Sequence, residues 1–225
     1  MHVYETRRKR KMLDILLNPN KFFEARMKEA ESLKVPALIV LLSGIISGIG
    51  AYLMTGITLE MLSKTLPPDA VGIASTIGGI SAFVGAVVVS LVMWIVFAAV
   101  FVGISWMFKG EGTFKRTLEF VGYGFIPMIV SGIIATVLMY HFISTTPIPQ
   151  VTDPAQLAEV ITEWIMKSPT IQLSSVIGIL FLLWSANIWI FGLKHARNLS
   201  TKNAVITVAI PVLVYILISV WRLGM

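Results

Sequence analysis

Cysteine is absent from this chain of 225 residues, and charged residues make up only 13% of it. Without cysteine the protein can form neither a disulfide framework nor a thiolate metal site, and it has no cysteine nucleophile. Soluble domains usually carry about 25% charged residues, so the shortage of charge places the chain among membrane proteins. The hydrophobic share of 56% and the mean hydropathy of +0.83 agree with that class.

Common enzyme motifs are also missing. The sequence contains no His-Glu-x-x-His pattern, no P-loop and no Gly-x-Ser-x-Gly elbow. The basic run Arg7–Lys11 is followed by Asp14 rather than by the apolar stretch of a cleavable signal peptide. We therefore predict a protein that is not an enzyme, with no catalytic residues, no metal and no other cofactor.

The chain has 18 Lys and Arg against 12 Asp and Glu, a net charge of +6. In a soluble protein such an excess would suggest nucleic acid as a partner. In a membrane protein it is better explained by cytoplasmic loops, which are enriched in Lys and Arg. We therefore expect no nucleic-acid partner.

Five segments are apolar and long enough to cross a bilayer, which takes about 20 residues each. They are 35–54, 80–108, 120–140, 171–193 and 204–221. The uncharged stretch 71–108 is too long for one upright span, because as a single helix it would be about 57 Å long. Either residues 71–79 form an outer interfacial piece before one tilted span, or the stretch folds as a hairpin and adds a sixth span.

The distribution of basic residues favours five spans. Residues 1–34, 109–119 and 194–203 hold nine, three and three of the 18 Lys and Arg, and with five spans all three regions lie on one side. By the positive-inside rule that side is the cytoplasm. We expect a multi-pass protein of the cell membrane with its N-terminus inside and its C-terminus outside. Residues 1–34 form a basic, amphipathic cytoplasmic segment and residues 35–225 a five-span, all-α membrane domain.

Two short helices are predicted outside the spans. Asn18 before Pro19 is a favourable helix start, and Phe22 and Phe23 then share one side of the helix while basic residues share the other. We expect this helix to lie at the interface, on the anionic lipids of the inner leaflet. A second amphipathic helix, within residues 153–168, is expected to cover the outer surface of the bundle.

Residues 121–124 read Val-Gly-Tyr-Gly, the tetrapeptide of potassium-channel filters. A charged stretch precedes them here instead of an apolar pore helix, which argues against a filter. The glycines would admit close packing around Tyr123, and Pro127 would free the Tyr123 carbonyl and kink the helix. We therefore predict a hinge at the inner membrane surface, in a helix that Thr113 caps.

Small and polar residues within the spans leave further alternatives open. Gly44 and Gly48, and the residues from Gly78 to Ser90 at every fourth position, would let helices approach closely. Their spacing does not decide whether the contact lies within one chain or between copies in a homo-oligomer. Asn187 is the most polar residue inside a span, and it would either hydrogen-bond to a neighbouring helix or line a pore or ligand site.

The segment from Phe108 to Leu138 resembles the Yip family of five-span membrane proteins, the Ypt/Rab-interacting type. Its pattern of a Gly-rich inner loop, then Gly-Tyr, then Pro is matched by Gly110, Gly112, Thr113, Phe114, Gly122, Tyr123 and Pro127. The start of the chain, with Asn18, Pro19 and Phe22, is similar to prokaryotic members. The resemblance implies a five-span architecture and no particular reaction. Eukaryotic members are linked to Rab GTPases and vesicle traffic, but their Asp-Leu-Tyr-Gly-Pro motif is not found here.

The leading hypothesis is a non-enzymatic membrane protein that organises the membrane or binds lipids or proteins at the cytoplasmic leaflet. Its expected partners are the bilayer, anionic inner-leaflet lipids, and other membrane or cytoplasmic proteins. The interaction and hinge residues would be Asn18, Pro19, Phe22, Phe23, Gly110, Gly112, Phe114, Gly122, Tyr123 and Pro127. The alternative is a passive channel or permease for an ion or small solute, which Asn187, the kinked third span and the many glycines would favour.

Overall fold

The computed structural model of the chain describes residues 13–224, and these contain helices and loops without any β-strand. The basic run Arg7–Lys11 lies outside the described residues. The elements are α2 (Pro19–Met27), α3 (Lys34–Met61), α4 (Pro68–Trp106), α5 (Phe114–Tyr123), α6 (Ile126–Thr145), the 3-10 turn η1 (Pro154–Gln156), α7 (Leu157–Met166), α8 (Pro169–Ala196) and α9 (Thr201–Gly224).

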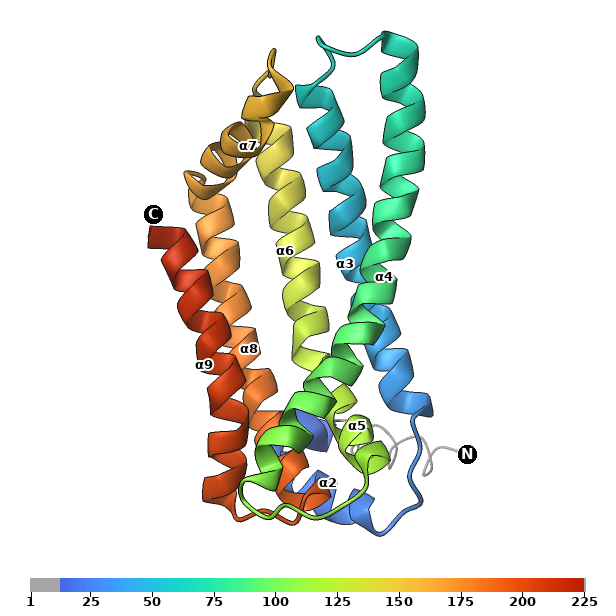
Figure 1. Cartoon of the computed structure of the whole chain (residues 1–225), viewed down its shortest axis with the longest axis vertical. Coiled ribbons are helices and arrows are strands. Elements are labelled where there is room, and N and C mark those ends of the chain that lie inside the picture. Colours follow the sequence, from blue (N-terminus) through green and yellow to red (C-terminus); the bar gives the residue numbers. More distant parts are fainter. Residues whose placement is uncertain (1–12, 225) are drawn as a thin grey trace.

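Five helical segments are long and apolar enough to cross a membrane, which confirms the predicted all-α membrane fold. They are Lys34–Met61, Val71–Trp106, Phe114–Thr145, Pro169–Ala196 and Thr201–Trp221. Figure 1 shows them side by side in one bundle, with α7 at one end and α2 and α5 at the other. We call these the α7 end and the α2–α5 end.

The long uncharged stretch forms one continuous helix, α4, and not a hairpin. Its paired glycines do not turn the chain, because they serve as contact points for α3: Gly78 faces Thr55 and Gly79 faces the ring of Tyr52. Residues 71–79 therefore continue the same helix that runs to Trp106. At 1.5 Å per residue α4 is about 58 Å long, nearly twice the thickness of a hydrocarbon core.

The small residues on the first two spans pack within the chain. Gly44 lies against Ser90 of α4, and Gly48 lies against the ring of Phe83. A side chain at either glycine would crowd the two helices, since its Cβ would lie 3.2 Å from Ser90 at Gly44 and 2.7 Å from the Phe83 ring at Gly48. This small-residue contact is therefore the α3–α4 interface.

The third apolar segment consists of two helices. Thr113 caps α5 as predicted, because its Oγ1 accepts a hydrogen bond from the Arg116 amide at 3.0 Å. The helix ends at Tyr123, and after two intervening residues α6 begins at Ile126, with Pro127 in its first turn. Since proline has no amide hydrogen, the Tyr123 carbonyl loses its normal helical partner at this break.

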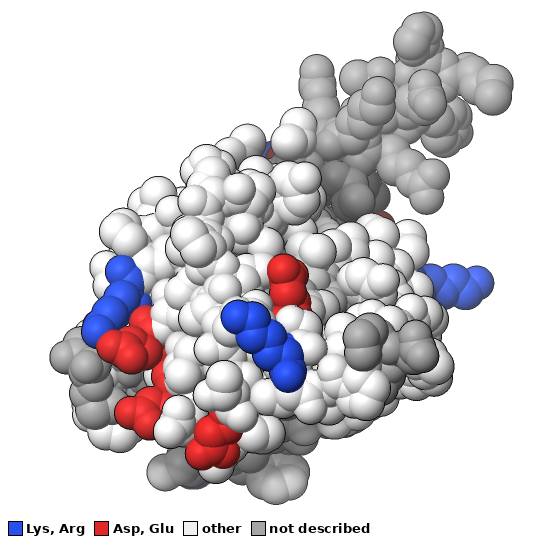
Figure 2. Space-filling model, turned by 90° about the horizontal axis from the view of Figure 1, so that it is seen from above, with Lys and Arg blue, Asp and Glu red and all other residues white. Residues whose placement is uncertain are grey.

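The α7 end holds a small apolar cluster of its own. Asp153 caps η1 as predicted, and α7 follows it directly. Ile57, Met61 and Val151 are buried beneath the apolar side of α7, where Trp164 lies. The surface above them carries scattered charges on a largely uncharged background (Figure 2). A shallow pocket of about 520 Å³ opens between α6, α7 and the start of α8.

Candidate functional site

Helix α2 is docked on the bundle by its aromatic side. The Asn18 side chain caps the helix by accepting from the Lys21 amide at 3.3 Å, and Pro19 in the first turn is buried. Phe23 is 0% exposed, with its ring 4.6 Å from that of Phe120, and Phe22 lies 5.1 Å from Tyr123.

Phe23 therefore faces the bundle and not lipid, while Phe22 is half-buried beside Tyr123. The bundle offers Phe23 a recess beside Gly192 of α8, whose missing side chain leaves room for the ring. Burying a large ring among aromatic partners stabilises the docked position.

Polar contacts fix α2 to the end of α8. The Asn20 side-chain oxygen accepts from Lys194 Nζ at 3.2 Å and lies 2.9 Å from His195 Nε2. Just before α2, the carbonyl of Leu16 accepts from the Trp184 indole at 3.3 Å. The N-terminal segment thus contacts α8 at several successive turns.

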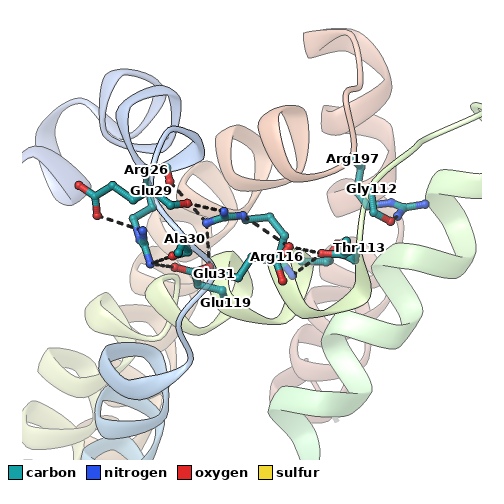
Figure 3. Close-up of polar contacts among 10 residues, drawn as sticks. Arg26, Glu29, Ala30, Glu31, Gly112, Thr113, Arg116, Glu119 and Arg197 are labelled. Atoms are coloured by element: carbon teal, nitrogen blue, oxygen red, sulfur yellow. Dashed lines mark hydrogen bonds and ion pairs between the residues drawn. The ribbon is translucent and has the colours of Figure 1, made fainter.

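Glu119 is the centre of a buried ion cluster that the sequence analysis missed (Figure 3). Its carboxylate is completely buried, and its two oxygens contact Arg26 at 2.5 Å and Arg116 at 2.9 Å. Arg26 belongs to α2 and the other two residues to α5, so the cluster ties these elements together. The spacing of Arg116 and Glu119, three residues apart, could have revealed one of these pairs.

The same two arginines hold the link between α2 and α3. Arg116 donates to the Glu29 carbonyl at 2.7 Å, and Arg26 donates to the Ala30 carbonyl at 2.8 Å (Figure 3). Burial opposes the charge on Arg26, but Glu119, Tyr123 and Glu29 together outweigh it, and the pKa of Arg26 lies above its ordinary value. Backbone carbonyls that no helix satisfies are thereby paired with charged donors.

Two tryptophan side chains pack against the Val-Gly-Tyr-Gly segment. The Trp94 indole donates to the Leu118 carbonyl and the Trp189 indole to the Val121 carbonyl, each at 2.8 Å. A methyl group at Gly122 would lie 3.0 Å from the Trp94 nitrogen, and one at Gly124 would overlap the Trp189 indole.

The glycines therefore make room for indoles and do not expose carbonyls to a pore. These residues belong to the end of α5 and the break that follows it, and Tyr123 is buried. The sequence analysis missed both tryptophans because they come from other helices, far from this segment in the chain.

Arg197 fixes the glycine-rich loop between α4 and α5. It donates to the Gly110 carbonyl at 2.6 Å, to the Gly112 carbonyl at 2.5 Å and to the Ser105 hydroxyl at 3.0 Å. Gly112 has a φ of +142°, and a methyl group there would overlap the Ala196 carbonyl. Burial lowers the pKa of Arg197. Its charged N–H groups donate hydrogen bonds to backbone carbonyls. Gly110 and Gly112 are thus turn positions that let the loop close over this side chain.

The remaining predicted residues lie apart from one another. Pro127 is buried in the first turn of α6, close to the break in the third segment. Phe114 is exposed at the start of α5. Asn187 is exposed on α8, and it forms no hydrogen bond with any residue in the described part of the chain. The structure therefore brings together Phe22, Phe23, Gly122 and Tyr123, but not Phe114 or Asn187.

Arginines and lysines at the α2–α5 end occupy different places. Arg26, Arg116 and Arg197 point inward and are used in the contacts above. Six lysines remain exposed there: Lys21, Lys28, Lys34, Lys109, Lys115 and Lys202. Near Lys109 and Lys115 in the chain, three large apolar residues also expose their side chains: Trp106, Met107 and Phe114. We call the surface formed by α2, α5, the loop 107–113 and the adjoining ends of α3, α4, α8 and α9 the platform.

The opposite end carries the opposite balance of charge. Its exposed charged residues are Glu60, Lys64, Asp153, Glu159, Glu163 and Lys167. Glu163 and Lys167 form an ion pair on α7. At the α2–α5 end, the exposed Glu24, Glu29 and Glu111 offset only part of the charge of the six lysines. The two ends of the bundle therefore differ in sign, with the basic excess at the α2–α5 end.

No group of three or more His, Asp or Glu residues that could hold a metal ion occurs in the part of the chain that the structure describes. The fold and the platform together define a polytopic membrane protein of five apolar helical segments, with structural charges buried at one end.

Residues 13–223 match the Yip1 domain, and the chain belongs to this family. It is similar to an uncharacterized protein of the archaeon Methanocaldococcus jannaschii, with 38% identity over 133 residues, 58% of this chain and 89% of the relative. No solved structure matches the chain. Neither the family nor this relative gives a sign of enzymatic activity.

Proposed function

We propose that the protein is a non-enzymatic scaffold of the cell membrane whose platform faces the cytoplasm and gathers anionic lipids of the inner leaflet. The observation that carries this proposal is the separation of arginines from lysines. Arginine suits buried, geometrically fixed pairs, while lysine is a hydrated point charge suited to an exposed surface. The buried arginines hold the platform in shape, and the six exposed lysines remain available to phosphate groups.

The surroundings of the lysines support lipid rather than a soluble anion. Trp106, Met107 and Phe114 expose large apolar side chains in the same stretch of chain as Lys109 and Lys115. Aromatic residues beside basic ones are typical of the zone where headgroups meet acyl chains. The excess of basic residues at this end supports a cytoplasmic position for it, since the positive-inside rule associates such residues with cytoplasmic loops.

Lipid selection at the platform can be measured by the quenching of Trp106 fluorescence with brominated lipids. Trp184 and Trp221, which are also exposed, are first replaced by Phe. In proteoliposomes, brominated anionic lipid should quench Trp106 more strongly than brominated zwitterionic lipid at the same mole fraction. The preference arises because each lysine near an anionic surface contributes about 1 kcal/mol of attraction.

A matched pair of double variants distinguishes an effect of the platform from an effect of the protein's net charge. Lys109→Gln with Lys115→Gln should weaken the preference, whereas Lys64→Gln with Lys167→Gln at the α7 end should keep it. Equal quenching by both lipids in the unmodified platform would refute lipid gathering. A protein partner on the same surface would then be sought by crosslinking from Lys109.

A further inference from the structure

Asn187 is an exposed amide on a helix face that is otherwise apolar. Exposed apolar faces occur on several spans, and acyl chains cover such faces without any partner protein. Asn187 continues the spacing of three and four residues followed by the exposed apolar residues of α8: Leu173, Val176, Leu180 and Leu183. In the described part of the five apolar segments, no other amide or charged side chain is exposed so far from the ends of its helix.

The position of Asn187 along α8 places its amide in the hydrocarbon core. The apolar run of this helix extends over residues 171–193, and Asn187 lies five residues from its middle, about 8 Å along the helix. Half of a hydrocarbon core is about 15 Å thick, so Asn187 lies within it. Any inclination of α8 brings Asn187 nearer to the midplane, because it shortens the height that these five residues cover.

The amide has no hydrogen-bond partner within a single copy. Acyl chains offer neither donors nor acceptors, and an unpaired amide in an apolar medium is costly. No hydrogen bond joins the Asn187 side chain to any residue between 13 and 224, its own helix included. A partner group outside this part of the chain would remove the cost.

We infer that Asn187 hydrogen-bonds to the same residue of a second copy, and that this face of α8 is the interface of a parallel homodimer. An asparagine amide carries both an acceptor and a donor group, so two of them that face each other across a two-fold axis can exchange a pair of N–H···O bonds. An axis along the membrane normal relates copies inserted in the same orientation and places Asn187 at the same depth in both. A single asparagine within an apolar helix pair also fixes the register of the pair.

The charged residue nearest to this face is drawn away from it. Lys194 lies seven residues after Asn187 and therefore on the same side of α8. Its Nζ lies 3.2 Å from the Asn20 side-chain oxygen and 6.0 Å from the centre of the Phe191 ring, so its charge is directed towards α2. The two copies can thus meet at Asn187 without bringing like charges together, and the dimer places two platforms on the same face of the membrane.

Oxidative crosslinking in proteoliposomes at low protein density tests the interface, since the chain has no cysteine of its own. Leu183→Cys, one turn from Asn187 on the same side of α8, should form disulfide-linked dimers. Leu213→Cys on α9 is the matched control for random collision, because the two leucines are 48% and 55% exposed and lie at similar distances from the platform ends of their helices. Equal crosslinking at the two positions would overturn the inference.

Energy transfer between copies that carry donor and acceptor dyes at Lys202 tests the role of the amide. The transfer should decrease when lipid dilutes the protein, and Asn187→Leu should weaken the dimer about fivefold or more, because the pair of hydrogen bonds is lost. Asn187→Gln keeps the amide and should weaken the dimer less. Asn187 is exposed in the single copy, so both variants should fold normally, which thermal unfolding checks. If Asn187→Leu dimerises as strongly as the unmodified protein, Asn187 is not paired across the interface and the inference fails.

Discussion

Replacing Glu119 by Gln is expected to lower the free energy of unfolding by about 3 kcal/mol or more. The substitution keeps the size of the side chain but removes the carboxylate that faces two arginines in a fully buried position. Removing one member of a buried ion cluster is costly because the remaining charges stay without compensation. Thermal unfolding in detergent micelles measures the effect.

Two further variants show whether the loss comes from the cluster. Glu163→Gln removes the exposed ion pair with Lys167 on α7 and should leave the melting temperature nearly unchanged. Adding Arg26→Met to Glu119→Gln should recover part of the loss, since one uncompensated charge disappears. If Glu119→Gln melts like the unmodified protein, the cluster does not hold α2 in place.

Replacing Gly124 by Ala should destabilise the protein by about 1–3 kcal/mol, the usual cost of overpacking a core. The added methyl group would overlap the Trp189 indole and disturb its hydrogen bond to the Val121 carbonyl. The same measurement of thermal unfolding applies. Gly85→Ala is the matched control, because nothing lies within 4 Å of the added methyl group there, and alanine also favours a helix.

A double-mutant cycle tests the contact itself. Trp189→Phe shortens the ring that meets Gly124, so Gly124→Ala should cost less in that background than in the unmodified protein. Identical costs in both backgrounds would mean that the glycine serves another purpose, such as flexibility at the break between α5 and α6.

The membrane-spanning architecture was predictable because its cause is local. Long apolar runs, the caps at Asn18, Thr113 and Asp153, and the break near Pro127 each depend on a few neighbouring residues. The Yip pattern around Gly122 and Tyr123 likewise pointed to the family to which the chain belongs. In each case the information lies within one turn of helix or one short segment.

The chemistry of the platform was not predictable in the same way. Arg26 and Glu119 are far apart in the sequence, and each alone resembles an ordinary surface charge. Glu119 directly precedes the apolar stretch expected to begin at residue 120, in a region expected to face the cytoplasm, so the sequence does not mark it as a buried charge. Likewise, the amphipathic character of α2 does not distinguish an apolar side that faces lipid from one that faces protein.

The orientation of the platform is the claim on which the proposed function rests, and cysteine labelling in intact cells tests it most directly. Ser63→Cys and Thr152→Cys lie near the α7 end, and Lys115→Cys and Lys202→Cys near the platform, all at exposed positions. A membrane-impermeant maleimide should label the first two in intact cells, and the last two only after permeabilisation. Labelling of Lys115→Cys and Lys202→Cys in intact cells, with protection of the other two, would contradict a platform on the cytoplasmic leaflet.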